Sequence, residues 1–279
     1  MSLDLRRFAK LPLYLRAFGP LAGLRLYAAI ERAGLPVKSE TVQAHAVPGY
    51  DAPVSLRRAR ADHATFWQCL VQRQYDLDRF PQTARLQQTY EAMLARGERP
   101  LIIDGGANIG LAALWLARRF PQAQIVSVEP DTGNLALLRR NLAGLGPRAQ
   151  VLDGGLWPRS GRLRIVNPES GSAAFRVEET TGDGPGTLRA YTIDEICTLA
   201  GCREPLIVKL DIEGAQQYLF ASATEWVGRA HLITLELDDW LFPWRGSSRP
   251  FFRVLGEHPF DYLLGGESVF CFRDAGAAV

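Results

Sequence analysis

The stretch that decides the fold runs Leu101-Ile102-Ile103-Asp104-Gly105-Gly106-Ala107-Asn108-Ile109-Gly110. An apolar run stops at a carboxylate and then opens into a glycine-rich turn. Residues 111–120 are apolar at helical spacing, so the local prediction is strand, tight turn and helix. Glycine at such a turn lets the backbone approach a ligand closely, and the start of the helix leaves backbone N–H groups free for an acceptor.

The charge of this turn indicates which ligand it favours. Its spacing, Asp-x-Gly-x-Asn-x-Gly, differs from the Gly-x-Gly-x-x-Gly of dinucleotide-binding proteins because Ala107 and Asn108 occupy the middle. A dinucleotide would place a doubly negative pyrophosphate here, and Asp104 would repel it. S-Adenosylmethionine has no phosphate and carries an ammonium and a sulfonium, which a carboxylate attracts. The turn therefore favours a cationic ligand.

A second apolar run, residues 125–128, ends at Glu129, 25 positions after Asp104. In an open α/β sheet, the carboxyl end of the neighbouring strand lies beside the first turn, and an acid there can accept both ribose hydroxyls. We therefore expect Glu129 to bind a ribose. A glycine turn alone could be a connection without a ligand, but the register of Asp104 and Glu129 favours a nucleoside site.

Length and composition are ordinary for a globular protein. At 279 residues, 47% hydrophobic and 22% charged, the chain can hold one large α/β domain with additions. Its 32 basic and 30 acidic residues give no indication of a nucleic-acid partner. Four cysteines without Cys-x-x-Cys or histidine clustering predict reduced thiols and neither zinc nor disulfides. No run of 18 apolar residues occurs and arginines interrupt the N-terminal apolar stretches, so we expect no membrane span, no signal peptide and a cytoplasmic location.

Residues 1–75 are expected to form a helical and mixed N-terminal extension, and residues 76–279 the main domain. Apolar positions recur at helical spacing over residues 1–34, with a break at Gly19-Pro20, and the segment is net basic when counted through residue 40. We expect one or two amphipathic helices, which either pack on the core, contact an anionic membrane surface or cover the substrate. A short strand pair within 39–54 and helices over 62–75 and 83–95 should follow.

The rest of the chain alternates strands with helices, as a parallel sheet requires. Asp131 is expected to cap a helix that carries Asn134 in its first turn and stops at Gly144. Thr192 has capping-box spacing to Glu195 and should begin a short helix. Further elements are predicted as strands at 149–153, 205–210 and 232–237, a helix at 215–222, a hairpin of 162–167 and 173–177 followed by a mobile loop at 178–186, and an antiparallel hairpin of 260–264 and 268–273.

Acidic side chains follow three of these strands. The third strand ends in Asp153-Gly154-Gly155-Leu156-Trp157, where a small loop could hold adenine. The fourth ends in Asp211-Ile212-Glu213-Gly214, so two carboxylates two residues apart could face one pocket, and a later strand ends at Glu236. These oxygens could bind a divalent metal, but no histidine or acid triplet has clear ligand spacing, so no metal is expected.

Two aromatic features each allow two interpretations. Tyr75 ends a helix just before the first strand, where it either packs in the core or caps the ligand. The connection Trp240-Leu241-Phe242-Pro243-Trp244-Arg245 either forms a wall for a sugar or macrocycle or plugs the sheet edge.

Four motifs together resemble the FkbM family of S-adenosylmethionine-dependent methyltransferases over about residues 75–273: Asp104 to Gly110, Val128-Glu129-Pro130-Asp131, Gly155-Leu156-Trp157, and Val208-Lys209-Leu210-Asp211-Ile212-Glu213-Gly214-Ala215. The Lys-x-Asp-Ile-Glu-Gly block is the most specific. The resemblance implies an α/β, Rossmann-like seven-stranded methyltransferase sheet with helices on both faces and an antiparallel C-terminal hairpin. It also implies O-methylation of a hydroxyl on a sugar, polyketide or related metabolite. The sequence departs from the family at Gln216, where glutamate is frequent.

Where the motifs match, the resemblance implies a role for each residue. Asp104 and the glycine turn would surround the methionine part of the cofactor, Glu129 would bind the ribose, and Leu156 would contact the adenine. Asp211 and Glu213 would lie at the transfer site. Combined with the strand-end residues, the candidate cofactor-binding residues are Tyr75, Asp104, Gly105, Gly106, Ala107, Asn108, Gly110, Glu129, Pro130, Asn134, Asp153, Gly155, Leu156 and Asp211, and the candidate catalytic residues are Asp211, Glu213 and Glu236.

The expected reaction is in-line displacement at the sulfonium methyl, in which the enzyme aligns a small-molecule or glycan hydroxyl and a general base removes its proton. Asp211 and Glu213 are the first candidates for that base, and Glu236 is the third. One alternative is a nicotinamide-dependent oxidoreductase that uses Glu129 for ribose, against which the missing Gly-x-Gly-x-x-Gly and Asp104 argue. Another is a protein that binds the cofactor without catalysis.

Overall fold

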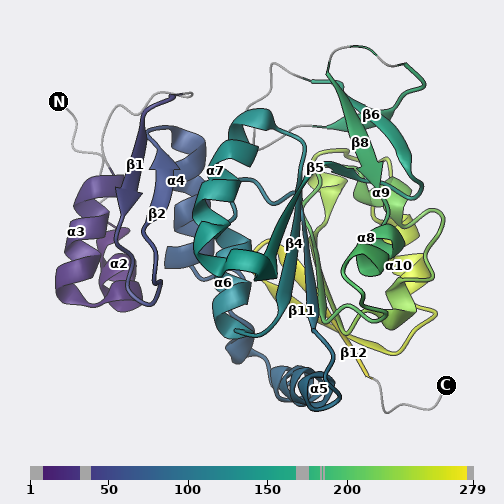
Figure 1. The fold of residues 1–279 in the computed structure, drawn as a ribbon, viewed down its shortest axis with the longest axis horizontal. Coiled ribbons are helices and arrows are strands. Elements are labelled where there is room, and N and C mark those ends of the chain that lie inside the picture. Colours follow the sequence, from purple (N-terminus) through teal and green to yellow (C-terminus); the bar gives the residue numbers. More distant parts are fainter. Residues whose placement is uncertain (1–8, 32–38, 168–175, 183, 185, 275–279) are drawn as a thin grey trace.

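The computed structural model describes residues 9–31, 39–167, 176–182, 184 and 186–274. Within this part of the chain, ten strands form one sheet in the order β11-β12-β10-β9-β3-β4-β5-β8-β6-β7 (Figure 1). Their bounds are β3 Leu101–Gly105, β4 Gln124–Glu129, β5 Ala149–Leu156, β6 Gly161–Ile165, β7 Val177–Glu179, β8 Thr187–Tyr191, β9 Ile207–Leu210, β10 Leu232–Glu236, β11 Phe260–Gly265 and β12 Ser268–Arg273.

Seven of these strands form the expected methyltransferase-type sheet. Strands β5, β4, β3, β9 and β10 run parallel, β12 is antiparallel to β10, and β11 is antiparallel to β12. The parallel strands are nearly continuous apolar runs because both of their faces are covered. Their carboxyl ends meet at one edge, where Asp104 lies opposite Lys209 and Glu129 lies opposite Asp153. The predicted fold class is therefore confirmed.

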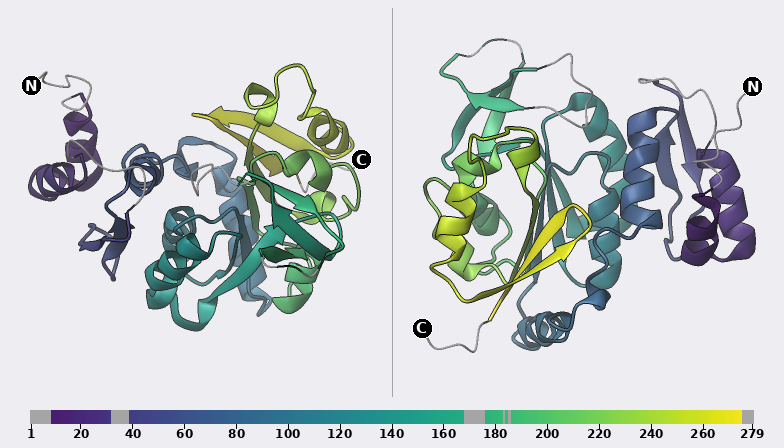
Figure 2. Two further views of the ribbon diagram at one scale, coloured as in Figure 1. Left: turned by 90° about the horizontal axis from the view of Figure 1, so that it is seen from above. Right: turned by 180° about the vertical axis from the view of Figure 1, so that it is seen from behind.

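Helices cover both faces of the sheet (Figures 1 and 2), and the sheet separates two apolar cores. Alternate residues of β3 face opposite ways, so that Ile102 packs into one core and Leu101 and Ile103 into the other. The first core is closed by α6 Leu111–Arg119 and α7 Thr132–Leu142; the second is closed by α8 Ile193–Leu199, α9 Gln216–Leu219 and α10 Arg249–Leu255. α5 Thr83–Ala95 has the predicted bounds, and short helices occur at η2 Leu77–Arg79, η3 Ala143–Arg148, η4 Val227–Arg229 and η5 Asp238–Trp240.

Helix starts follow the predicted capping chemistry. The Asp131 carboxylate accepts a hydrogen bond from the Asn134 N–H at 2.7 Å, and the Thr192 hydroxyl accepts one from the Glu195 N–H at 3.0 Å. Each cap satisfies a backbone donor that the helix itself leaves free. The capped helix α7 ends at Leu142, two residues before the glycine expected to stop it.

Several elements of the main sheet and its helices differ from the sequence-based prediction. Strand β8 was not predicted; it inserts between β5 and β6 and extends the sheet beyond seven strands. Helix α10 was also missed, and α9 is shorter than the predicted 215–222. Most of the predicted second hairpin arm, 173–177, lies outside the described residues. The strand that pairs with β6 is β7, at Val177–Glu179.

The N-terminal region forms the edge of the molecule away from β11 and β12 (Figure 2). It contains α2 Leu11–Phe18, α3 Pro20–Ile30, β1 Val42–His45, β2 Val54–Arg57, α4 Arg60–Phe66 and the π-helix η1 Trp67–Val71. The predicted break at Gly19-Pro20 is confirmed, whereas the helix expected over 62–75 ends at Val71.

Helices α2 and α3 are amphipathic as expected and pack through Tyr14, which contacts Phe66 and Trp67. Leu21 and Leu24 remain 64% and 52% exposed on the outer face of α3. Contact of these helices with an anionic membrane surface stays a prediction. Within the described part of the chain, no helix combines the length and apolar character needed to cross a bilayer.

Asn141 of α7 connects the N-terminal strand pair to the main sheet domain. Its Oδ1 accepts a hydrogen bond from the Ser55 N–H at 2.8 Å, and its Nδ2 donates to the carbonyls of Ser55 at 3.1 Å and Ile109 at 2.8 Å. Because Asn141 and Ser55 are buried, loss of this amide would leave backbone groups without a partner.

We predict that Asn141→Ala lowers the free energy of unfolding by about 1–3 kcal/mol, the cost of leaving buried backbone groups unpaired. Urea denaturation followed by circular dichroism would measure it. The matched control is Gln88→Ala at an exposed position of α5, which should change stability by less than about 0.5 kcal/mol. Equal stability of the two variants would contradict this role of Asn141.

Candidate active site

Two cavities adjoin at the carboxyl edge of the parallel strands. The smaller measures about 60 Å³ and the larger about 610 Å³. Both are lined by Gly106, Asn108, Asp211 and Glu213, so the cavities meet at the glycine turn and the end of β9. The two cavities thus lie at the strand ends that carry several of the predicted site residues.

The glycine turn approaches β9 too closely for a side chain. Gly106 has φ +69°, and a Cβ there would lie 1.7 Å from the Asp211 carbonyl oxygen. The N–H groups of Gly106 and Ala107 both donate to the Val128 carbonyl at 3.0 Å, which holds the turn against β4. Asn108 also has positive φ, at 50°. The turn is therefore kept in a conformation that only glycine adopts freely at position 106.

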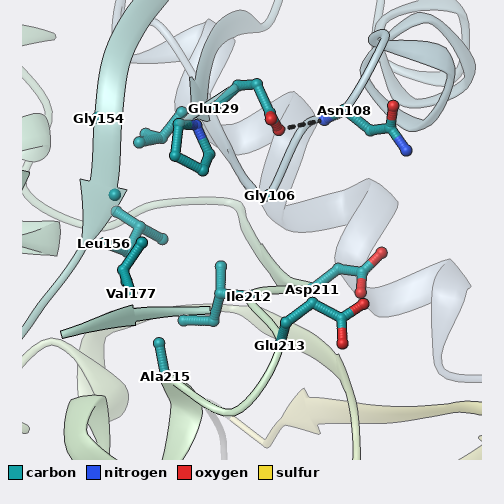
Figure 3. Close-up of a pocket in the computed structure, with 13 residues that line it drawn as sticks. Gly106, Asn108, Glu129, Gly154, Leu156, Val177, Asp211, Ile212, Glu213 and Ala215 are labelled. Atoms are coloured by element: carbon teal, nitrogen blue, oxygen red, sulfur yellow. Dashed lines mark hydrogen bonds between the residues drawn. The ribbon is translucent and has the colours of Figure 1, made fainter. Parts of the chain in front are cut away.

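Glu129 is held at the end of β4 by three donors. Its Oε2 accepts from the Asn108 N–H at 2.7 Å (Figure 3), and its Oε1 accepts from the Asp131 N–H at 3.0 Å and from Asn134 Nδ2 at 3.2 Å. Burial raises the pKa of Glu129 to about 7, although these hydrogen bonds oppose the shift. The carboxylate lines the smaller cavity, where the sequence places a ribose-binding acid.

Lys209, which the sequence analysis names only as part of the Lys-x-Asp-Ile-Glu-Gly block, has a role that the sequence did not predict. Its Nζ lies 3.0 Å from Asp104 Oδ1 and 3.7 Å from Asp211 Oδ2, and it donates to the Gly106 carbonyl at 2.8 Å. Burial by itself would lower the pKa of Lys209, but the charges of Asp104 and Asp211 raise it overall, so the ammonium stays charged. The signal was available, since a lysine inside an apolar strand must find a charged partner.

Asp104 has a different environment from the one expected. Its side chain is fully buried, lines neither cavity and is paired with Lys209. The expectation that this carboxylate faces a cationic ligand must therefore be revised: Asp104 compensates the charge of Lys209, and the cavities are lined instead by the carboxylates of Glu129, Asp211, Glu213 and Glu236.

The catalytic candidates gather around the larger cavity. The carboxylates of Asp211 and Glu213 point the same way, away from the apolar side chains of Leu156 and Ala215 (Figure 3). Glu236 lines the same cavity. Glu213 has φ +47°, which for a non-glycine residue stores strain of the kind found at functional sites.

Burial and neighbouring negative charges raise the pKa values of Glu213, Glu236 and Asp238. Burial raises the pKa of Glu213 to about 7, and the charges of Asp211, Asp238 and Glu236 add to the shift. Burial and the charge of Asp211 raise the pKa of Glu236 to about 7 as well, against a hydrogen bond from Gln74. Asp238 follows the same trend, with a pKa of about 6. Glu213 and Glu236 would therefore each be about half protonated near pH 7.

Two glutamines organise this cluster. Gln74 Nε2 donates to Glu236 Oε1 at 2.8 Å and to Ser268 Oγ at 3.0 Å. Gln216, the departure from the family pattern, accepts from the Gly214 N–H at 3.0 Å and donates to the Glu236 carbonyl at 3.2 Å. Gln216 therefore ties the end of β9 to the end of β10.

The remaining predicted residues divide between lining and supporting positions. The smaller cavity is lined by Pro130, Gly155 and Leu156, and the larger by Tyr75 and Ala107. Gly105, Gly110, Asn134 and Asp153 line neither cavity: Gly105 and Gly110 pack closely on Leu156 and Leu138, Asn134 contacts Glu129, and Asp153 is exposed. Lining residues that sequence reasoning did not identify include Gly154, Val177, Ile212, Ala215, Gln74 and Cys69.

Among the aromatic residues of the 240–245 connection, Trp240 lines the larger cavity while remaining 71% exposed, and Trp244 is fully exposed. Phe242 packs against Gly214, where a Cβ would lie 2.6 Å from its ring. The connection therefore contributes one aromatic side chain to the cavity mouth and one to the support of the β9 turn. Over the described residues, no group of three or more His, Cys, Asp or Glu side chains is arranged to hold a metal ion.

Parts of the chain are similar in sequence to known methyltransferases. Residues 104–240 match the family model of the methyltransferase FkbM domain. The chain is 25% identical over 157 residues to the 2-O-methyltransferase NoeI of Sinorhizobium fredii, covering 50% of this chain and 64% of that protein. It is 34% identical over 75 residues to a release factor glutamine methyltransferase of Geobacter sulfurreducens, covering 27% of this chain and 26% of that protein.

Among solved structures, the chain is similar to the methyltransferase FkbM from Methylobacillus flagellatus, with 16% identity, a TM-score of 0.43, and coverage of 62% of this chain and 43% of that one. The match to NoeI spans less than two thirds of that relative's length. The fold is a Rossmann-like sheet of the methyltransferase type. Residues 104–240, just under half of the chain, are similar to the methyltransferase FkbM domain.

Two glycines with positive φ allow a matched test of the turn. Gly106→Ala should lower the free energy of unfolding by about 2–5 kcal/mol, because it adds backbone strain and a collision with the Asp211 carbonyl. Gly97→Ala, at φ +74° with no atom within 4 Å, adds strain alone and should cost only about 1–2 kcal/mol. Thermal and urea unfolding would compare them, and equal losses would show that the close approach at position 106 is unimportant.

Proposed function

We propose that this protein binds S-adenosylmethionine and transfers its methyl group to a hydroxyl of a neutral, sugar-like acceptor. The observation that carries the proposal is the pair of adjoining cavities lined by Glu129, Asp211, Glu213 and Glu236. Among the described residues that line them, Lys209 is the one cation, and Asp104 compensates its charge. Such a lining attracts a sulfonium and repels a pyrophosphate.

The residues of the smaller cavity fit the nucleoside part of this cofactor. A carboxylate offers about four acceptor positions, and three donors of the protein occupy Glu129, so an acceptor position remains for a ribose hydroxyl. Leu156, Val177 and Ile212 provide the apolar surface that an adenine ring needs. The turn at 106–108 would hold the amino acid part. When bound, S-adenosylmethionine supplies an electrophilic methyl group.

The larger cavity supports the acceptor assignment. Its acids disfavour an anionic acceptor, while Trp240 at its mouth offers a flat apolar face to a sugar ring. Glu213 and Glu236, with pKa values of about 7, would be the groups that remove the hydroxyl proton, and Asp211 lies beside them. The similarity to NoeI, a 2-O-methyltransferase, is consistent with oxygen as the acceptor atom.

We further propose that the N-terminal region belongs to the functional unit. Thr65, Gln68, Cys69 and Gln74, all from the extension at 1–75, line the larger cavity. This segment would therefore form one wall of the acceptor site, next to the domain that holds the cofactor.

Calorimetry would test the cofactor assignment. We expect S-adenosylhomocysteine to bind with one site per chain and NAD to give no heat of binding. Glu129→Gln should weaken S-adenosylhomocysteine at least about tenfold, because a charge-assisted acceptor for the ribose is lost. Glu225→Gln, which changes an exposed acid that lines neither cavity, is the matched control and should bind as wild type. Tight NAD binding would instead support the oxidoreductase alternative.

A transfer assay would separate an enzyme from a protein that only binds the cofactor. With methyl-labelled S-adenosylmethionine and neutral oligosaccharides as probes, we expect label in the sugar. Glu213→Gln, Glu236→Gln or Asp211→Asn at the true base should slow transfer about 10²–10⁴-fold. Glu213→Gln and Glu236→Gln should leave S-adenosylhomocysteine affinity within about threefold. Glu257→Gln, at an exposed position, is the control. If all three active-site variants transfer at the wild-type rate, the base assignment is wrong.

The raised pKa values predict a pH profile. A carboxylate accepts a proton only when ionised, and a pKa of about 7 leaves roughly one tenth of Glu213 or Glu236 ionised at pH 6. We therefore expect kcat/KM to rise about tenfold per pH unit below pH 7 and to level off above it. A profile that is flat between pH 5.5 and 8 would contradict a base from this cluster.

A further inference from the structure

We propose that Arg57, on β2 of the N-terminal region, is a positioning residue for Glu129 and thereby for cofactor binding. Arg57 does not line either cavity. It acts through Asn134 of α7, which lies between it and the carboxylate. The inference rests on the proposed function, because Glu129 is taken there as the ribose acceptor.

Asp62 of α4 fixes the Arg57 guanidinium. Arg57 Nε lies 3.0 and 3.1 Å from the two carboxylate oxygens of Asp62, and Nη2 lies 2.8 Å from Oδ1. The Arg57 backbone N–H donates to the same carboxylate at 2.7 Å. The Asp62 side chain is 1% exposed and that of Arg57 is 14% exposed. A forked pair of this kind holds the planar guanidinium in one orientation.

The fixed guanidinium determines the orientation of the Asn134 amide. Arg57 Nη2 donates to Asn134 Oδ1 at 2.5 Å, and Asn134 Nδ2 donates to Glu129 Oε1 at 3.2 Å. A guanidinium has only donors, so the amide must turn its oxygen toward Arg57 and its nitrogen toward Glu129. If the Asn134 amide were flipped, its oxygen would face the Glu129 carboxylate and its N–H groups would face the N–H groups of Arg57. Arg57 thus selects the orientation in which Asn134 supports Glu129.

The consequence reaches the cavity through Glu129 Oε1. Asn134 Nδ2 and the Asp131 N–H hold this oxygen, while the Asn108 N–H holds Oε2. Without Arg57, the Asn134 donor would no longer be directed at Oε1, and the carboxylate would lose one of the contacts that set its angle toward a ribose. Arg57 and Asn134 lie 77 positions apart in the sequence. The relay, in which Arg57 orients Asn134 and Asn134 supports Glu129, therefore exists only because the strand pair β1–β2 packs on α7.

Calorimetry with S-adenosylhomocysteine as the probe tests the relay in the full chain. We expect Arg57→Ala and Asn134→Ala each to raise Kd about tenfold. The double variant should match Asn134→Ala within about twofold, because Arg57 acts only through that amide. Arg57→Lys, which keeps a donor but not the fork, should raise Kd less than Arg57→Ala. Arg58→Ala, at the adjacent exposed position, should bind as wild type.

These outcomes separate positioning from general stability. Thermal unfolding of the same variants identifies any loss of fold, and Arg57→Lys gives the affinity reading if Arg57→Ala does not fold. The relay is overturned if folded Arg57→Ala or Arg57→Lys binds as tightly as wild type, or if the effects of Arg57→Ala and Asn134→Ala multiply in the double variant. Failure of the wild-type chain to bind S-adenosylhomocysteine would instead contradict the proposed function.

Discussion

The arrangement of the site depends on one buried ion pair, between Lys209 of β9 and Asp104 of β3. Both side chains lie within the sheet, 3% and 0% exposed, with 3.0 Å between Nζ and Oδ1. A buried ammonium requires charged and polar partners, and Lys209 finds them in Asp104, Asp211 and the Gly106 carbonyl. Through these contacts it joins the end of β9 to the glycine turn, where the two cavities meet.

This pair also determines the charge that a ligand meets. Because Asp104 is the nearest acid to Lys209, the cavities keep an excess of acids in Glu129, Asp211, Glu213 and Glu236. Burial raises the pKa values of Glu129, Glu213 and Glu236 to about 7, and repulsion by Asp211 adds to the shifts of Glu213 and Glu236. A cationic methyl donor would relieve that repulsion. The preference for a cationic ligand that the sequence predicts at Asp104 would therefore come from the acids at several strand ends.

The central sheet and the position of the site could be predicted because their signals are local: apolar runs that end in acids or glycine, and caps such as Asp131 and Thr192. The role of Lys209 was not predicted because it depends on pairing across two strands. Strand β8 was missed because Thr187–Tyr191 is partly polar and follows a glycine-rich loop. The contacts of Arg57 with Asn134 and of Gln74 with Glu236 join segments far apart in the chain, which one sequence cannot bring together.

The most direct test of this account is a double-mutant cycle on the free energy of unfolding with Asp104→Asn and Lys209→Met. Lys209→Met leaves the buried charge of Asp104 unpaired, and Asp104→Asn removes the nearest charged partner of Lys209. Each single change should cost about 3–5 kcal/mol, whereas the double variant removes both charges. We predict that the double variant is more stable than either single variant, with a coupling energy above about 2 kcal/mol. Additive losses would show that the two side chains do not stabilise each other, and would contradict the account.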